Sequence, residues 1–305
     1  MKSPKCKFLL LHILLLCGLA LLVLKYVEEI QMFKQTIYDT IHPKSVSETT
    51  DDPITLYPVE INGDEWFVEH PLIYHAGGAI EGNKYTNSVE AVENTLSEGK
   101  NFIEIDLRYT CDNVLVCAHN WDDIYLEDRQ PTLEEFLSSK IQGKFSPLTA
   151  EHLIEIMRQN TEMYLITDIK DTDLCTAISD LVALAEEDPA ILDRFIIQLY
   201  TGREKTSVQE IYPFKDSQFL FTTYNWGDWQ LEVAQICNEE NIAVITVPYG
   251  KMPDEDAALM RELGFTVYEY TVDRADKANF SLTRGISGFY TDTLSPDDLE
   301  YESGQ

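Results

Sequence analysis

The sequence predicts an α/β protein built as a (β/α)8 TIM barrel, and three observations support this prediction. Short apolar runs typical of buried parallel strands recur along the chain and alternate with segments of helical periodicity. From Leu56 onward about 250 residues remain, a length that suits one barrel better than two small domains. Polar residues follow several of the apolar runs, and barrels place their chemistry at the C-terminal ends of their strands.

Eight parallel strands and the helices between them are expected in this domain. The predicted strands are 72–78, 102–109, 163–169, 194–199, 219–224, 242–248, 265–271 and 286–291. Helices are predicted at 87–98, 150–160, 173–186, 229–241 and 254–263.

The run 114–119 is interpreted as a hairpin strand that follows the second barrel strand. It lies too close to Asp106 for a parallel crossover, which needs a dozen or more residues, so it is expected to return antiparallel. The next connection, 120–147, is expected to lie over the barrel mouth as a partly helical loop.

The N-terminal segment predicts a membrane anchor. Residues 8–24 are apolar apart from His12 and are flanked by lysines, which is close to the ~20 residues that span a bilayer. We therefore expect a cytoplasmic tip and transmembrane signal anchor at 1–27, a polar stalk at 28–55 and the barrel at 56–305. This arrangement predicts a single-pass protein of the cell membrane with the barrel outside the cytoplasm. A cleaved signal peptide is the alternative.

The chain carries a formal net charge of -30. Such a field repels polyanions and argues against nucleic acid as a partner, although an acidic surface also serves solubility alone. The sequence leaves the oligomeric state open.

Residues 72–121 hold the chemistry-bearing side chains. His75 follows the first predicted strand, and Glu104 and Asp106 lie two residues apart on the second, so their side chains share one face. Two buried acids on one face need a cation, and oxygen ligands suit a hard ion such as Mg²⁺ or Ca²⁺. The hairpin is expected to return His119 to the neighbourhood of these acids.

The order of these motifs resembles the glycerophosphodiester phosphodiesterases and, more loosely, the bacterial phosphatidylinositol-specific phospholipases C. The resemblance covers roughly residue 71 to the C-terminus. It is carried by His75-x-Gly77, Asn87-Ser88, Glu104-x-Asp106, Thr110-x-Asp112, Val116-x-x-His119, the Thr-Asp-Ile-Lys run at 167–170, the Ile-Ile-Gln run at 196–198, and the runs 267–273 and 288–292.

The resemblance implies an acid/base pair and a cation site. It also implies that the substrate is a phosphodiester, either a small molecule or a lipid head group. His75 and His119 take the acid/base roles, and Glu104, Asp106 and Asp168 take metal ligation of Mg²⁺ or Ca²⁺. The side chains implied in substrate binding are Lys170, Asn87, Gln198 and Tyr270.

The chain departs from the phosphodiesterase pattern at three positions. Ala76 stands where the family has a phosphate-binding arginine, Asn120 where it has an acid after the second histidine, and Thr86 where an acid precedes the Asn-Thr pair. These differences favour a divergent substrate.

Other interpretations of the same residues stay open. One is a catalytically altered barrel that binds envelope phosphates or sugars, and another is a glycosidase that uses two acids across a sugar cleft. For single residues, His119 could be structural, Asp168 with Lys170 could be a buried salt bridge, and Asn87 could simply cap the following helix.

Overall fold

The computed structural model describes residues 56–59, 65–126, 129–170, 173–202, 204–224, 226 and 230–300. The predicted anchor at 1–27 and stalk at 28–55 lie outside these residues. Across the described ranges, no helix is both long enough and apolar enough to cross a membrane.

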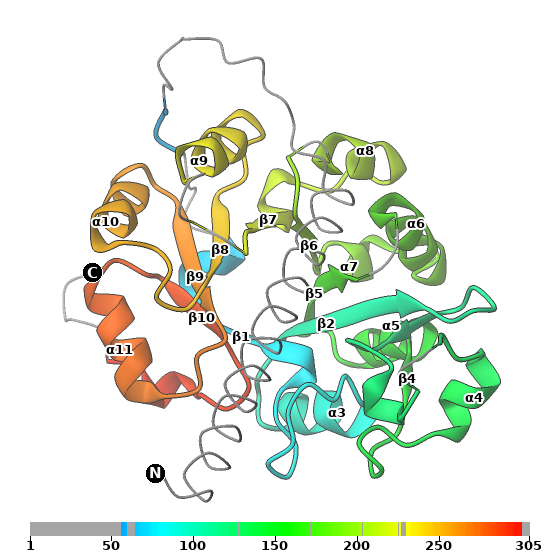
Figure 1. Cartoon of the computed structure of the whole chain (residues 1–305). Coiled ribbons are helices and arrows are strands. Elements are labelled where there is room, and N and C mark those ends of the chain that lie inside the picture. The colour runs from blue at the N-terminus through cyan, green and yellow to red at the C-terminus, as the bar shows by residue number, and fades with distance from the viewer. Residues whose placement is uncertain are drawn as a thin grey trace, which may run out of the picture. The chain divides into compact units, whose positions relative to one another are not determined.

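The described strands close into a barrel of eight parallel strands, as the sequence predicts (Figure 1). Closure follows because β1 pairs in parallel with both β10 and β2. Each strand lies within its predicted range: β1 (Leu72–Tyr74), β2 (Phe102–Tyr109), β5 (Tyr164–Ile169), β6 (Phe195–Leu199), β7 (Phe219–Thr222), β8 (Val244–Pro248), β9 (Thr266–Tyr270) and β10 (Gly288–Thr291). These runs are rich in β-branched and aromatic residues that the helices cover, which explains why they read as continuous apolar stretches.

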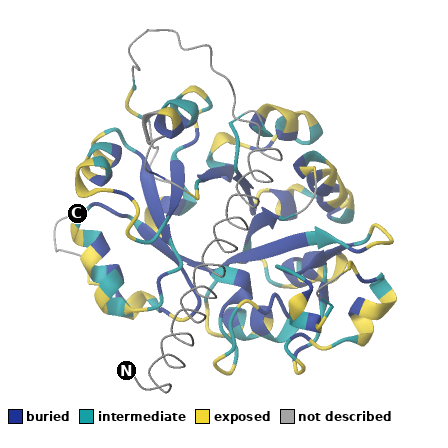
Figure 2. Ribbon diagram, in the orientation of Figure 1, coloured by how far each residue is buried: buried dark blue, intermediate teal, exposed yellow. Residues whose placement is uncertain are grey.

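The helices form an outer ring whose inner faces are buried and whose outer faces are exposed (Figure 2). The five helices predicted from periodicity are confirmed as α3 (Val89–Ser97), α5 (Ala150–Gln159), α6 (Leu174–Leu184), α9 (Gln230–Glu239) and α10 (Asp254–Glu262). The remaining α-helices of the barrel are α7 (Pro189–Leu192), α8 (Glu204–Ile211) and α11 (Ala275–Thr283), and the short helix α2 (Trp66–Glu69) precedes β1. Four 3₁₀ turns are described, namely η1 (His75–Gly77), η2 (Asp122–Ile124), η3 (Asp216–Gln218) and η4 (Pro296–Asp298).

The barrel interior has an apolar floor with polar side chains above it. The floor is a cluster made of Phe67 of α2 and one inward residue from each barrel strand: Ile73, Phe102, Ile166, Ile196, Leu220, Val244, Tyr268 and Tyr290. Two residues farther along most strands, the same face carries polar side chains: His75, Glu104, Asp168, Gln198, Thr222, Thr246, Tyr270 and Asp292. The fold therefore presents a polar layer toward the C-terminal mouth.

The hairpin after β2 is confirmed, with one addition that the sequence does not predict. Strand β3 (Leu115–Cys117) runs antiparallel to β2, and a two-residue strand, β4 (Leu148–Thr149), pairs antiparallel with β3. Residues 148–149 carried no prediction, because two residues are too few to show a strand period.

The segment between β3 and β4 forms a small subdomain that contains α4 (Leu133–Ser138). Its own apolar cluster is Val116, Ala118, Trp121, Ile124, Phe136, Ile141 and Phe145. Because this cluster is built on β3, the subdomain lies beside β2 at one edge of the barrel and does not extend across the mouth as expected (Figure 1).

Candidate active site

The turn after β1 directs the first histidine and a backbone donor toward the acids of β2. Ala76, Gly77 and Gly78 all have positive φ values, of 49°, 87° and 83°. A Cβ atom on Gly78 would lie 2.4 Å from the Thr95 hydroxyl oxygen, so the close approach of this turn to α3 requires glycine. The turn leaves the Ala76 N–H free to donate to Glu104 Oε2 at 2.7 Å.

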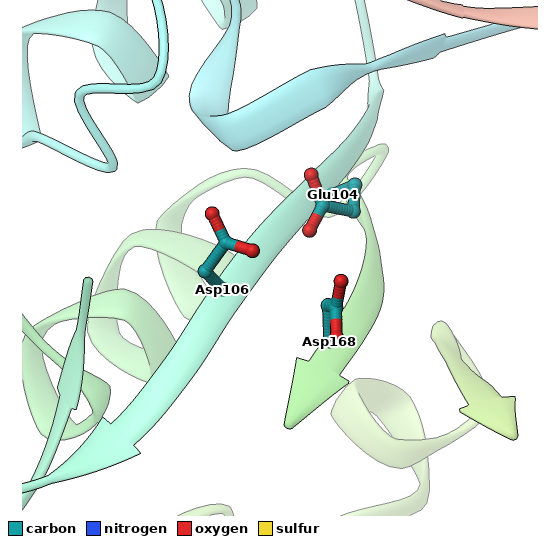
Figure 3. Close-up of side chains that lie close together, drawn as sticks. All are labelled: Glu104, Asp106 and Asp168. Atoms are coloured by element: carbon teal, nitrogen blue, oxygen red, sulfur yellow. The ribbon is translucent and has the colours of Figure 1, made fainter. Parts of the chain in front are cut away.

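Three carboxylates meet at the C-terminal side of β2 and β5. Glu104 and Asp106 come from β2 and Asp168 from the adjacent β5, and Figure 3 shows the three side chains facing a shared space. One oxygen from each lies within 4.8 Å of the others, and all three side chains are buried. The acids form one group on neighbouring strands and do not oppose each other across a cleft, which argues against the glycosidase alternative.

The acid cluster fits a hard divalent cation. Burial, and next the negative charge of Asp106, raise the pKa of Glu104 to about 8. Glu104 Oε1 is buried and has no hydrogen-bond partner among the residues that the structure describes. An all-carboxylate donor set with an unsatisfied buried oxygen matches the oxygen ligands that Mg²⁺ and Ca²⁺ take in proteins.

Lys170 lies against the same acids. Its Nζ atom lies 2.8 Å from Asp106 Oδ1 and 2.6 Å from Asp168 Oδ2. Burial opposes the charge of this amine, but the attraction of Asp168 and then Asp106 outweighs burial, so the pKa of Lys170 is raised. The lysine therefore offsets part of the negative charge of the cluster.

Asn87 holds Asp106 through two hydrogen bonds. Asn87 Nδ2 donates to Asp106 Oδ2 at 2.8 Å, and the Asp106 N–H donates to Asn87 Oδ1 at 3.0 Å. The N-cap of α3 is Ser88, whose hydroxyl accepts from the Ala91 N–H, so the helix-capping interpretation of Asn87 is wrong. Asn87 has a left-handed backbone, with φ of 47°, which turns its amide inward.

His75 is hydrogen-bonded on one ring nitrogen and faces the acid cluster with the other. Its Nδ1 lies 3.1 Å from Asp292 Oδ1, and its Nε2 lies 3.9 Å from Glu104 Oε2. Burial disfavours the imidazolium, but the hydrogen bond to Asp292 and the charges of Glu104 and Asp106 prevail and raise the pKa of His75 to about 9. Asp292 thereby fixes the orientation of the ring.

His119 is half-buried, and its ring shares one neighbour, the Tyr85 ring, with that of His75. The centroid of the Tyr85 ring lies 4.4 Å from that of His75 and 6.0 Å from that of His119, with steep interplanar angles of 86° and 76°. The Asn120 amide lies beside His119 Nδ1 at 3.4 Å. The hairpin thus places His119 at the mouth of the barrel, where His75 follows β1.

Gln198 and Tyr270 lie on the far strands and bond to other protein groups. Gln198 Nε2 donates to the Tyr200 hydroxyl at 2.7 Å, and Gln198 Oε1 accepts from the Tyr290 hydroxyl at 3.0 Å. Tyr200 in turn donates to Asp168 Oδ1 at 2.9 Å, so Gln198 supports a member of the acid cluster. The Tyr270 hydroxyl donates to the Thr223 carbonyl at 2.9 Å.

Three residues of this site received no role from the sequence. Asp292 and Tyr200 had a usable signal, because both lie at the C-terminal end of a barrel strand on its inward face. Tyr85 had no usable signal, because its position depends on a left-handed loop conformation, with φ of 59°, that the surrounding sequence does not predict.

Several solved structures share this fold. A glycerophosphoryl diester phosphodiesterase from Parabacteroides distasonis is 20% identical, with a TM-score of 0.57, covering 77% of this chain and 86% of that one. An Oleispira antarctica phosphodiesterase in complex with the product sn-glycerol-3-phosphate is 16% identical, with a TM-score of 0.56 and coverage of 72% and 92%. A glycerophosphodiester phosphodiesterase from Thermotoga maritima is 17% identical, with a TM-score of 0.54 and coverage of 73% and 94%.

No curated protein sequence gives a significant match to the chain. The model of the glycerophosphoryl diester phosphodiesterase family, in contrast, matches residues 80–295, which include most of the barrel and all three acids of the cluster. With that match over most of its length, the chain belongs to the glycerophosphoryl diester phosphodiesterase family, whose members are phosphoric diester hydrolases.

Proposed function

We propose that this protein is a membrane-anchored, metal-dependent phosphodiesterase in which His75 and His119 share proton transfer. The observation that supports the proposal is a combination of contacts: the Tyr85 ring contacts both imidazoles, and His75 faces the buried group of three carboxylates. A barrel that only bound phosphates or sugars would have no need for this combination, which favours hydrolysis over the non-catalytic alternative.

The carboxylates of Glu104, Asp106 and Asp168 would hold one Mg²⁺ or Ca²⁺ ion. When bound, such an ion neutralises charge on the phosphoryl oxygens and orients the phosphodiester. The protein keeps the ligands in place: Asn87 fixes Asp106, the Ala76 N–H fixes Glu104, and Tyr200 fixes Asp168.

Proton transfer falls to the two imidazoles. One takes the proton of the attacking oxygen and the other gives a proton to the leaving oxygen, which requires each nitrogen to come within hydrogen-bond reach of its oxygen. The Asp292 carboxylate accepts from His75 Nδ1, which leaves Nε2 on the side of the acid cluster for this transfer.

The four predicted substrate-binding residues contact the site in different ways. Lys170 carries a positive charge at the cluster and is proposed to share the phosphoryl charge with the metal ion, because Ala76 supplies no guanidinium. Asn87 and Gln198 use their amides on Asp106, Tyr200 and Tyr290, so we propose that they act through these partners. Tyr270 lines the same inward face of the barrel near the mouth.

The substrate is proposed to be a small-molecule phosphodiester or the phosphodiester of a lipid head group. A structural relative of the same fold was solved with the product sn-glycerol-3-phosphate, which makes glycerophosphodiesters the first substrates to test. The apolar residues 8–24 support a location at the cell membrane with the barrel outside the cytoplasm.

A hydrolysis panel tests this function. The full-length protein, purified in detergent, is assayed with glycerophosphocholine, glycerophosphoinositol and bis(p-nitrophenyl) phosphate, with Mg²⁺, with Ca²⁺ and with chelator. We expect hydrolysis of at least one diester that chelator abolishes and added metal restores. Hydrolysis that persists at the full rate in chelator, or no hydrolysis of any diester with either metal, overturns the proposal.

Membrane fractionation tests the location. We expect the full chain to stay with membranes through an alkaline wash, and a variant with Leu14→Arg and Leu16→Arg to be released. Release of the unmodified chain by the wash would contradict the predicted membrane anchor.

A further inference from the structure

Lys84 links the loop after β1 to two carboxylates beyond the ends of β9 and β10. Its Nζ atom pairs with Asp273 and lies 3.4 Å from Asp292 Oδ2. The hydrogen bond to Asp273 is the largest of the effects that raise the pKa of Lys84, so the amine stays charged. Two neighbouring acids therefore share one ammonium group.

A tight turn brings Lys84 to this place. Ile80 and Asn83 exchange two backbone hydrogen bonds of 2.9 Å around residues 81–82, which both have positive φ, of 51° and 78°. Positive φ at both central residues is typical of the type I′ turn, which reverses the chain within two residues. Beyond the turn, the Lys84 carbonyl accepts from Gln142 Nε2 of the small subdomain at 2.9 Å, so the backbone at Lys84 is held as well.

Asp292 is held at both its backbone and its side chain. Its N–H donates to Asp273 Oδ1 at 2.7 Å, and its carbonyl accepts from the Ala79 N–H at 2.9 Å. Its Oδ1 atom lies 3.1 Å from His75 Nδ1, while Oδ2 faces Lys84. Because the backbone contacts fix the main chain, these side-chain contacts set the rotation of the carboxylate, with Lys84 on the oxygen opposite His75.

Loss of the Lys84 charge would release this carboxylate. Asp273 and Asp292 would then lie together without the cation that they share, and like charges in one site repel. The Asp292 side chain is only 2% exposed, so solvent screens this repulsion poorly. A rotation of Asp292 would take its Oδ1 acceptor away from His75 Nδ1 and free the imidazole to turn.

We propose that Lys84 is a positioning residue, which orients His75 for proton transfer by holding the Asp292 carboxylate from its other oxygen. Misplacement of a reacting group by about 1 Å can lower a rate by about 100-fold, so a contact at one remove from the imidazole has a measurable effect. The inference rests on the proposed function, because that function assigns proton transfer to His75.

Steady-state kinetics of Lys84→Met and Lys84→Arg test this role on the diester that the unmodified protein cleaves fastest. Methionine removes the charge, whereas arginine keeps it and can pair with both carboxylates. We expect Lys84→Met to lower kcat by about 10- to 100-fold with KM within about twofold, and Lys84→Arg to recover most of the loss. An unchanged kcat overturns the proposal, and so does a rise in KM alone, which would mean that Lys84 binds substrate.

Lys144→Met is the matched control. Lys144 belongs to the small subdomain and pairs with Glu81 of the same loop, and its side chain is 51% exposed compared with 41% for Lys84. We expect this variant to keep the kcat of the unmodified protein. Melting temperatures verify folding, and the kinetics are measured below the lowest of them. An equal loss of kcat in the Lys84→Met and Lys144→Met variants would show that only the anchoring of the loop matters, which overturns the proposal.

A double-mutant cycle tests whether the effect of Lys84 passes through Asp292. In the Asp292→Asn background the charge that Lys84 holds is already gone, so adding Lys84→Met should lower kcat by less than about twofold. Fully additive losses would show that Lys84 acts by another route and would overturn the proposal.

The ring nitrogens of His75 give a readout that needs no turnover. Full-length protein labelled with ¹⁵N-histidine is examined by NMR in detergent at one pH without added metal, and a His75→Gln variant assigns the signals. We expect Lys84→Met to shift the His75 Nδ1 signal, Lys84→Arg to restore it and Lys144→Met to leave it unchanged. If no diester is hydrolysed, the proposed function fails, and these signals alone decide whether Lys84 positions His75. A His75 Nδ1 signal that is the same in Lys84→Met as in the unmodified protein overturns the inference.

Discussion

Asn87 and Asp106 exchange two hydrogen bonds, at 2.8 and 3.0 Å, so the amide of one residue determines the orientation of a buried carboxylate on another. One oxygen of Asp106 is taken by Asn87 and the other faces Lys170 at 2.8 Å. Both carboxylate oxygens of Asp106 are therefore held by protein groups. This pairing makes the amide of Asn87 a sensitive place to perturb the site.

Asn87→Asp should lower metal affinity or activity by about 10- to 100-fold, because it replaces a donor to a ligand carboxylate with a like charge. The measurement is the metal concentration that gives half-maximal hydrolysis. Asn113→Asp is the matched control, since Asn113 is an exposed asparagine with a similar left-handed backbone, φ of 60°. Equal metal dependence in the two variants would contradict the role assigned to Asn87.

Asp106→Asn should abolish metal-dependent activity and leave the barrel folded. Burial disfavours the Asp106 carboxylate, but the attraction of Lys170 prevails and lowers the pKa of Asp106, so removal of this charge should lower the metal-free melting temperature. A ligand at 100 times its dissociation constant stabilises the folded state by about 2.7 kcal/mol, and this gain should be lost in the variant.

The check for this variant is a pair of melting curves with and without Mg²⁺ or Ca²⁺. Asp276→Asn, which changes a 65% exposed carboxylate paired with Arg274, should keep the full metal-induced shift. A metal-induced shift of undiminished size in Asp106→Asn would place the ion elsewhere.

Lys170→Met should reduce kcat/KM by about 100-fold or more, because loss of one group from a charge clamp costs several kcal/mol of transition-state stabilisation. Lys170 contacts both Asp106 and Asp168, so the variant should also depend more strongly on metal for its stability. Steady-state kinetics decide the first effect, with Lys251→Met at an exposed lysine as the control. Near-normal turnover in Lys170→Met would show that another cation holds the phosphate.

Arg194→Met should destabilise the fold without touching the site. The guanidinium of Arg194 is buried and donates to four carbonyl oxygens, those of Met157, Asn160, Met163 and Ala190. Removing it takes one donor from each of these carbonyls, at about 1–3 kcal/mol for each that is left unpaired and that water does not reach; the Asn160 carbonyl keeps the Met163 N–H. Denaturant unfolding measures the loss, and Arg158→Met, at a more exposed arginine, should lose less. Equal losses would mean that the carbonyls find other donors.

The barrel strands and the main acids were predictable because both follow from a period of two. Alternation along 102–107 places Glu104 and Asp106 on one face, and the same rule applied to the strand ending at Ile169 brings Asp168 beside them. Strand order then follows from the parallel crossovers between neighbouring strands.

What the sequence left out depends on loop conformation and on contacts between distant segments. The Tyr85 ring reaches both histidines only because its loop is held by Asp273, Asp292 and Gln142, which lie far from it in sequence. Asn87 was interpreted as a substrate-binding residue or a helix cap. Its left-handed backbone, which directs the amide toward Asp106, cannot be predicted from sequence periodicity.

The most direct test of the central claim is the hydrolysis rate of His75→Ala and His119→Ala, measured with saturating metal on the diester that the unmodified protein cleaves fastest. His152→Ala, at an exposed histidine of α5, serves as the control, and melting temperatures verify folding. A shared acid/base pair predicts that each of the two substitutions lowers kcat by about 10²- to 10⁴-fold while the control stays at the unmodified rate. A His119→Ala variant that is folded and turns over within about twofold of the unmodified protein would contradict the two-histidine account.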